Sequence, residues 1–156
     1  MRILMVCLGN ICRSPMAEGI LRSEITKRKL THVVDSAGTG NWHSGEAPDR
    51  RAIATAKKFG VDISKLVARQ IDRGDLESFD KIFVMDLANY DAVLRLTRNA
   101  EEKAKVELFL NQVNPGQDEE VPDPWFGEAD GFIPVYKMLE AACTNFLNTI
   151  EKIHQS

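Results

Sequence analysis

Cys7 and Arg13 lie six residues apart near the start of the chain, and their side chains suit attack on a bound phosphate. A thiolate is a nucleophile, and helix N-termini and nearby cations favour the thiolate over the thiol. Arginine carries a planar fork of donors that matches two phosphoryl oxygens, a geometry that lysine lacks. The pair therefore predicts nucleophilic chemistry at phosphorus, provided that the chain between them forms an anion-binding loop.

The segment 7–15 has the composition of such a loop. It follows a short apolar run that is typical of a buried strand, and it precedes a segment with helical periodicity. Gly9 and Asn10 tolerate left-handed backbone angles, which lets successive amide N–H groups turn toward one point. Ser14 suits the N-cap and Pro15 the first helical position, so we expect the helix dipole to add positive charge at that point.

Asp123 is a second candidate for chemistry, because it lies between two prolines in a long acidic loop, residues 111–128. The prolines restrict the backbone and so limit the directions of the carboxyl group. A phosphate ester that breaks needs a proton on its leaving oxygen. We therefore expect Asp123 to act as general acid in a first step and as base for water in a second. The alternative for Asp123 is a structural aspartate in a turn of the acidic loop. The alternative for the first pair is that Cys7 is a buried structural cysteine and Arg13 a solvated arginine.

Strands and helices alternate along the chain. Strands are predicted at residues 2–6, 32–37, 81–85 and 106–110, and helices after Pro15, after Asp49, near Asp75, at 87–97 and from 132 onward. This order predicts an α/β fold with three layers: a four-stranded parallel open sheet, helices on both faces, and the phosphate-binding loop after the first strand. Ligands in such sheets bind beyond the carboxyl ends of the strands, where Cys7 lies.

Length and composition favour a single domain over residues 1–156. Hydrophobic residues make up 44% of the chain and the net charge is −3, which gives no reason to expect nucleic-acid or membrane binding. The apolar start ends at residue 8, so we expect no signal peptide and a cytoplasmic location. Thiols stay reduced there, which favours the three cysteines as chemistry or core. Three scattered histidines and few cysteines disfavour a metal site.

Residues 7–15, Cys-Leu-Gly-Asn-Ile-Cys-Arg-Ser-Pro, resemble the phosphate-binding loop of the low-molecular-weight protein tyrosine phosphatases. Residues 122–126, Pro-Asp-Pro-Trp-Phe, resemble that family's general-acid loop, and residues 35–49 resemble the segment between them. The resemblance covers essentially the whole chain. It implies a single phosphatase domain that hydrolyses phosphotyrosine monoesters through a cysteinyl-phosphate intermediate, without metal or cofactor. It implies phosphotyrosine proteins or small aryl phosphates as substrates, and inorganic phosphate as product.

The resemblance also implies which residues contact the substrate. Trp42 and Trp125 would flank the phenyl ring in a deep slot that favours phosphotyrosine over phosphoserine, although packing of the loops alone is a competing role. Many relatives carry Tyr at the position of Phe126, so regulation by phosphorylation there would be lost. The residues that would hold the phosphate are Leu8, Gly9, Asn10, Ile11, Cys12, Arg13 and Ser14.

The two cysteines of the loop would form a redox pair. In the family, Cys7 and Cys12 can join in a reversible disulfide that shields the nucleophile from overoxidation. Cys143 falls on the apolar side of the last predicted helix, so we expect it in the core.

A set of polar side chains is expected to support the loop. Ser14 would donate to the Cys7 thiolate and ease its departure from the phosphoenzyme. Asn10 and Ser36 resemble a family network that holds the loop in its strained shape. Leu66 stands where better-known relatives often carry a histidine that contacts this network. We therefore expect the network to be shorter or different here.

Two alternative functions remain. Arsenate mimics phosphate, so the same scaffold suits arsenate reduction, but that chemistry passes oxidation through further thiols. A non-catalytic phosphoprotein-binding or redox-sensing module is a different class. The presence of Cys7, Arg13 and Asp123 together argues against it, because a binding module needs no acid.

Overall fold

The computed structural model describes residues 1–155 and is built around a four-stranded parallel sheet. The strand order is β2-β1-β3-β4. The chain therefore moves from β1 to one side and then returns to the other, so that a topological switch point lies between β1 and β3. This arrangement confirms the predicted α/β class. The strands are β1 (Arg2–Cys7), β2 (Val33–Gly38), β3 (Lys81–Val84) and β4 (Val106–Leu108).

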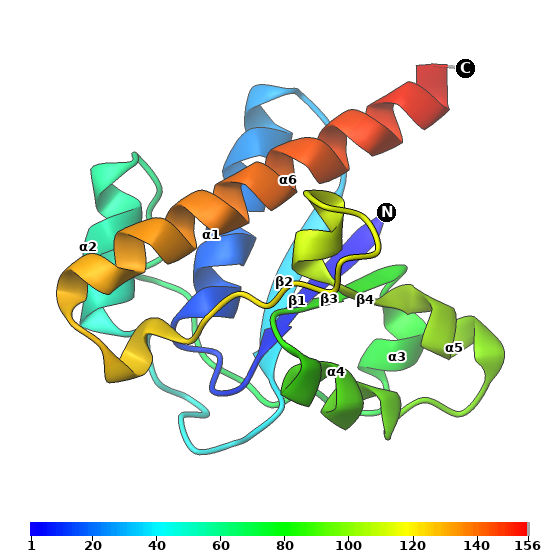
Figure 1. The fold of residues 1–156 in the computed structure, drawn as a ribbon, viewed down its shortest axis with the longest axis horizontal. Coiled ribbons are helices and arrows are strands. Elements are labelled where there is room, and N and C mark those ends of the chain that lie inside the picture. The colour runs from blue at the N-terminus through cyan, green and yellow to red at the C-terminus, as the bar shows by residue number, and fades with distance from the viewer. Residues whose placement is uncertain (156) are drawn as a thin grey trace.

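Helices cover both faces of the sheet (Figure 1). One face packs against α1, α2 and α6, and the other against α3 and α4, so each face has its own cluster of buried apolar side chains. Alternate residues of β1 enter the two clusters, because successive side chains of a strand point to opposite faces. The helices are α1 (Arg13–Lys27), α2 (Arg50–Lys58), α3 (Asp75–Ser78), α4 (Leu87–Leu94), α5 (Ala100–Lys105) and α6 (Phe132–Gln155).

Several predicted boundaries were wrong. The predicted helix 87–97 ends at Leu94, because tight backbone bonds from Leu96 and Thr97 close the turn. The strand predicted to reach residue 110 stops at Leu108 and continues as a 3₁₀ helix, Phe109–Gln112. Strand β2 extends one residue beyond its predicted end, to Gly38.

Helix α5 was not predicted. Its signal is the N-cap Asn99, whose side chain accepts a hydrogen bond from the backbone of Glu102.

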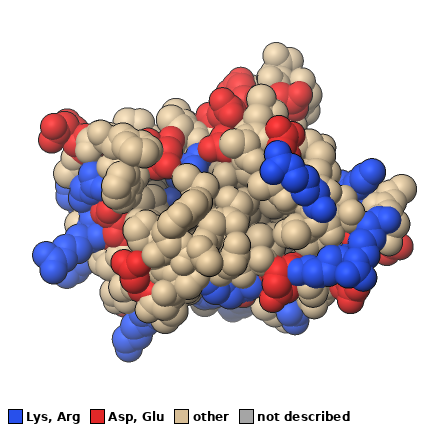
Figure 2. Space-filling model, turned by 90° about the horizontal axis from the view of Figure 1, so that it is seen from below, with Lys and Arg blue, Asp and Glu red and all other residues tan. Residues whose placement is uncertain are grey.

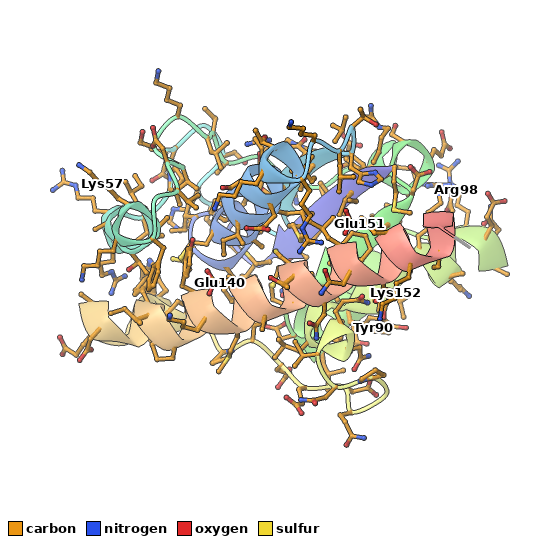
Figure 3. The ribbon with its side chains drawn as sticks, turned by 90° about the horizontal axis from the view of Figure 1, so that it is seen from above. Lys57, Tyr90, Arg98, Glu140, Glu151 and Lys152 are labelled. Carbon is orange, nitrogen blue, oxygen red and sulfur yellow. The ribbon has the colours of Figure 1, made fainter. Side chains whose placement is uncertain are left out.

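Helix α6 is the longest helix and lies along α1. Arg28 at the end of α1 forms an ion pair of 2.9 Å with Glu151, which Figure 3 shows on the side of α6 that faces α1. Cys143 is fully buried on the inner side of α6, as predicted. No helix within the described residues is long and apolar enough to cross a membrane.

Candidate active site

The loop that follows β1 turns sharply before α1 begins. Cys7 ends the strand, and Asn10 has a positive φ of 58°, the left-handed conformation expected for this position. The end of β2 lies directly against the loop. A Cβ added to Gly38 would lie 2.8 Å from the carbonyl oxygen of Leu8, so only glycine permits this approach. The backbone N–H of Thr39 donates to the carbonyl of Cys7 at 2.9 Å and fixes the two segments together.

The predicted start of α1 was wrong by two residues. Arg13 is the first residue of the helix, and Cys12, not Ser14, is its N-cap, without a side-chain capping bond. Pro15 still fits, because backbone N–H groups in the first turn have no partner within the helix. The hydroxyl of Ser14 is free of the capping role and lies 3.0 Å from the Cys7 sulfur. The predicted contact between Ser14 and Cys7 is therefore present.

A chain of buried hydrogen bonds lies behind the nucleophile. The side-chain amide of Asn10 donates to Ser14 Oγ at 2.8 Å and to Ser36 Oγ at 2.9 Å. Its carbonyl oxygen accepts from the backbone N–H of Arg69 at 3.0 Å. Ser36 in turn donates to Glu18 Oε1 at 2.6 Å. All three polar positions of the Asn10 amide are thus engaged, which fixes its side chain and the loop around it.

Glu18 is the last member of this network. It is buried on α1 and pairs with Arg22, whose guanidinium also donates to the carbonyl of Val34 at 2.9 Å. Burial raises the pKa of Glu18, although hydrogen bonds from Ser36 and Arg22 oppose the rise. Leu66 is half-buried and packs against the apolar cluster beside α1. Leu66 therefore makes no polar contact with the network, whose last member is the carboxyl group of Glu18.

Arg13 is held by groups from two segments, the residue that follows β3 and the acid loop. Its Nη1 forms an ion pair of 2.7 Å with Asp86 and donates to the carbonyl of Val121 at 2.9 Å. Its Nη2 lies 3.6 Å from Asp123 Oδ2. Burial would lower the pKa of Arg13, but the charges of Cys7, Asp86 and Asp123 outweigh it and raise the pKa. The guanidinium is therefore a fixed cation at the base of the loop.

Asp123 begins a short 3₁₀ helix, Pro124–Phe126, and its Oδ1 accepts from the backbone N–H of Trp125 at 3.0 Å. The loop is anchored just before it, because Val121 is fully buried and its N–H donates to the carbonyl of Met85 at 2.8 Å. One carboxylate oxygen is thus fixed by the backbone, while the other faces the guanidinium of Arg13.

Cys12 lies beside the nucleophile in a different environment. Burial raises its pKa far above the ordinary value, and the nearby charges of Asp49 and Cys7 add to the rise. Its thiol is therefore protonated at neutral pH, and it is poorly suited to be a second nucleophile.

These segments enclose one cleft. Trp42 is 68% exposed, Trp125 44% and Phe126 80%, so all three aromatic side chains stand at the rim. The 39–49 loop that carries Trp42 lies at the lower edge of Figure 1. Figure 2 views the molecule from that side: the centre is uncharged, and charged side chains gather toward the edges. The cleft is lined by Cys7, Leu8, Gly9, Ile11, Cys12, Arg13, Trp42, His43, Asp123, Trp125 and Phe126.

The structure brings most of the predicted residues together. Asn10, Ser14 and Ser36 do not line the cleft but lie behind its floor. Sequence reasoning missed three residues. Asp86 follows β3 at the edge of the sheet where the loop lies, Glu18 is four residues after Ser14 on the same helix, and His43 follows Trp42.

Known proteins resemble this chain over nearly its whole length. The chain matches the family described as low molecular weight phosphotyrosine protein phosphatase over residues 2–156. It is 42% identical over 152 residues to the low molecular weight phosphotyrosine protein phosphatase of Schizosaccharomyces pombe, covering 96% of each chain.

Solved structures of similar proteins have the same fold. The protein tyrosine phosphatase of Entamoeba histolytica has a TM-score of 0.91 at 36% identity, with 97% of each chain covered. An arginine phosphatase of Drosophila has a TM-score of 0.89 at 33% identity, covering 96% of this chain and 98% of the other. The chain belongs to the low molecular weight phosphotyrosine protein phosphatase family.

Proposed function

We propose that the protein hydrolyses phosphotyrosine monoesters, with Cys7 as nucleophile, Arg13 as phosphate ligand and Asp123 as general acid. The observation that carries this proposal is their convergence on one cleft: Cys7 and Arg13 line its floor, and Asp123 Oδ2 lies 3.6 Å from Arg13. The amides of residues 8–12 and the start of α1 complete a positive site for a phosphate dianion.

In the first step the Cys7 thiolate attacks phosphorus and forms the S–P bond. The P–O bond to the aryl group breaks, and its electron pair goes to the phenolic oxygen, which takes the proton of the Asp123 carboxyl group. Arg13 and the loop amides hold the three equatorial oxygens, where negative charge is concentrated during transfer.

In the second step water attacks the cysteinyl phosphate. The Asp123 carboxylate takes a proton from the water, the S–P bond breaks, and its electron pair returns to sulfur as inorganic phosphate leaves. The hydroxyl of Ser14, 3.0 Å from the sulfur, is placed to donate to the departing thiolate.

The aromatic side chains at the rim of the cleft support the assignment of an aromatic substrate. Trp42 and Trp125 line the cleft and stand exposed at its rim, where indole rings can pack against a phenyl ring. A guanidinium also stacks on aromatic faces, and one relative of this fold is described as an arginine phosphatase. Hydrolysis of a phosphotyrosine peptide in preference to a phosphoarginine peptide would support the tyrosine assignment.

The position of Cys12 supports a role in protecting the nucleophile Cys7 from overoxidation. Cys12 lines the same cleft as Cys7, and both thiols are free. We propose that hydrogen peroxide in the cytoplasm oxidises the two thiols to a reversible disulfide and is itself reduced to water. Arsenate reduction by a longer thiol relay is disfavoured, because Cys143 is buried in the core against the carbonyl of Ala17.

Hydrolysis of p-nitrophenyl phosphate in EDTA tests the proposal. We expect turnover by the wild type and its loss in Cys7→Ser, and reversible suppression by peroxide that thiol restores. No turnover from folded, reduced wild-type protein, or full turnover by Cys7→Ser, would refute the proposed function.

A further inference from the structure

The loop that carries Asp123 receives little support from its own side chains. Its aromatic residues Trp125 and Phe126 stand exposed, and Pro124 is the buried member of the 3₁₀ helix. The N-terminal end of the loop is anchored through Val121, as described above. An attachment of similar strength is needed at the other end, because a loop fixed at one point swings about it.

Arg51, near the start of α2, supplies that attachment. Its Nη2 donates to the carbonyl of Trp125 at 3.1 Å, and its Nη1 donates to the carbonyl of Gly127 at 3.0 Å. Its guanidinium lies over the ring of Phe132, 4.7 Å from the ring centroid. Among the described residues, no other side chain donates a hydrogen bond to a carbonyl group of residues 122–128.

Asp49 connects Arg51 to the phosphate-binding loop. Arg51 Nε and Nη2 bind the two Asp49 carboxylate oxygens, each at 3.0 Å, in the two-point geometry that fixes both planes. The backbone N–H of Asp49 donates to the carbonyl of Ile11 at 2.8 Å. Asp49 is also the N-cap of α2, so its position is set by the helix. One continuous set of bonds thus runs from the phosphate-binding loop through Asp49 and Arg51 to the acid loop.

We propose that Arg51 is a positioning residue for the general acid, an inference that rests on the proposed function. It holds the 122–127 segment at a fixed distance from the phosphate-binding loop, so that the Asp123 carboxyl group faces the leaving oxygen. Arg51 does not line the cleft and does not touch the phosphate. Its contribution is therefore confined to the step that needs the proton.

Two substrates with different leaving groups separate this role from a general structural one. Phenyl phosphate has a poor leaving group that needs the proton, whereas 2,4-dinitrophenyl phosphate has a good one that does not. The quantity to compare is kcat/KM, which reports steps up to the first phosphoryl transfer and so excludes hydrolysis of the phosphoenzyme. Both substrates are measured on the same sample, so their ratio does not depend on the folded fraction.

We expect Arg51→Ala to lower kcat/KM for phenyl phosphate by about tenfold to a hundredfold, since misplacement by about 1 Å costs that much. For 2,4-dinitrophenyl phosphate the change should stay within about twofold. Arg51→Lys should recover part of the loss, because an ammonium group keeps the charge but cannot reach Asp49 and both carbonyls together. Arg50→Ala is the matched control, because Arg50 precedes Arg51 on the same helix and is exposed. Its side chain forms no hydrogen bond or ion pair within the described chain.

A double-mutant cycle completes the test. If Arg51 acts through Asp123, Arg51→Ala should add little to the loss of phenyl phosphate turnover already caused by Asp123→Asn. Equal losses with both substrates, or additive losses in the double variant, would overturn the proposal. Those results would leave the proposed function intact, because its test compares the turnover of Cys7→Ser with the turnover of the wild type.

Discussion

The floor and the rim of the cleft are built in opposite ways. On the floor, Cys7 is 3% exposed, and directly behind it Asn10 and Ser14 are at most 2% exposed. Each of the three is bonded to a neighbour. At the rim, Trp42 is 68% exposed and Phe126 80%. A group that stabilises charge must be held before the substrate arrives, and water must be kept from it. A surface that selects substrates needs only to be present, so the floor is suited to the reaction and the rim to the choice of substrate.

The largest expected effect comes from removing the support behind the floor, at Asn10. Asn10→Ala removes three hydrogen bonds and leaves buried partners, including Ser14 and Ser36, without a donor. We expect a loss of about 2–3 kcal/mol in the free energy of unfolding, because unpaired buried polar groups cost about 1–3 kcal/mol each. We also expect kcat to fall about tenfold or more. Urea denaturation and steady-state kinetics measure both.

Asp118→Ala is the matched control for this variant. Asp118 also has a positive φ, 54°, and a side-chain hydrogen bond, 3.0 Å to Asn111, but it lies in an exposed loop. It should change stability by less than about 1 kcal/mol and leave kcat unchanged. An equal loss in the two variants would show that backbone strain, not the buried network, explains the result for Asn10.

The rim should show a smaller effect of another kind. Trp42→Ala should raise KM for an aryl phosphate by about tenfold or less, since an aromatic pair contributes about 0.5–1.5 kcal/mol. The kcat value and the Ki of inorganic phosphate should stay the same, because phosphate contacts only the floor. A parallel change in the phosphate Ki would contradict the separation of floor and rim.

Gly40→Ala tests the same point without removing the indole ring. A Cβ at Gly40 would lie 1.8 Å from the Trp42 ring, so the ring must move away. We expect the same rise in KM as in Trp42→Ala, measured with the same aryl phosphate. An unchanged KM would mean that the position of the ring is unimportant for substrate binding.

The smallest expected effect is in the pH dependence of stability. Burial raises the pKa of Glu18, so above about pH 4.5 the folded protein holds a proton that the unfolded chain releases. The contribution of this group to the free energy of unfolding therefore falls as pH rises through that window. The glutamine of Glu18→Gln does not titrate. The Tm of this variant should therefore fall less than the Tm of the wild type between about pH 4.5 and 7. Glu101→Gln, in an exposed residue of α5, should keep the wild-type slope.

Much of the fold followed from local patterns. Short apolar strands alternate with amphipathic helices, so the parallel sheet and the position of Cys7 at the end of β1 were predictable. The end of β4 was not, because Phe109 and Leu110 read as strand residues but turn into the core as a 3₁₀ helix. There Phe109 packs against Phe83, with ring centroids 4.8 Å apart.

The site was predictable where chemistry depends on residue type, and less so where it depends on tertiary contacts. Cys7, Arg13 and Asp123 carry their reactivity in their side chains. Glu18 looks like an ordinary helix residue, and only packing against β2 brings it to Ser36. Similarly, Ser14 has the residue type of an N-cap, but its hydroxyl turns to Cys7, and the helix begins one residue before it.

The central claim is that Cys7 carries the phosphoryl group during turnover. Acid quenching of the wild type during hydrolysis of p-nitrophenyl phosphate, followed by mass analysis of the peptides, tests it directly. The account predicts one added phosphoryl group on the peptide that contains Cys7, and none on the peptide that contains Cys143. Steady turnover with no phosphoryl group on Cys7, or with the group on another residue, would contradict it.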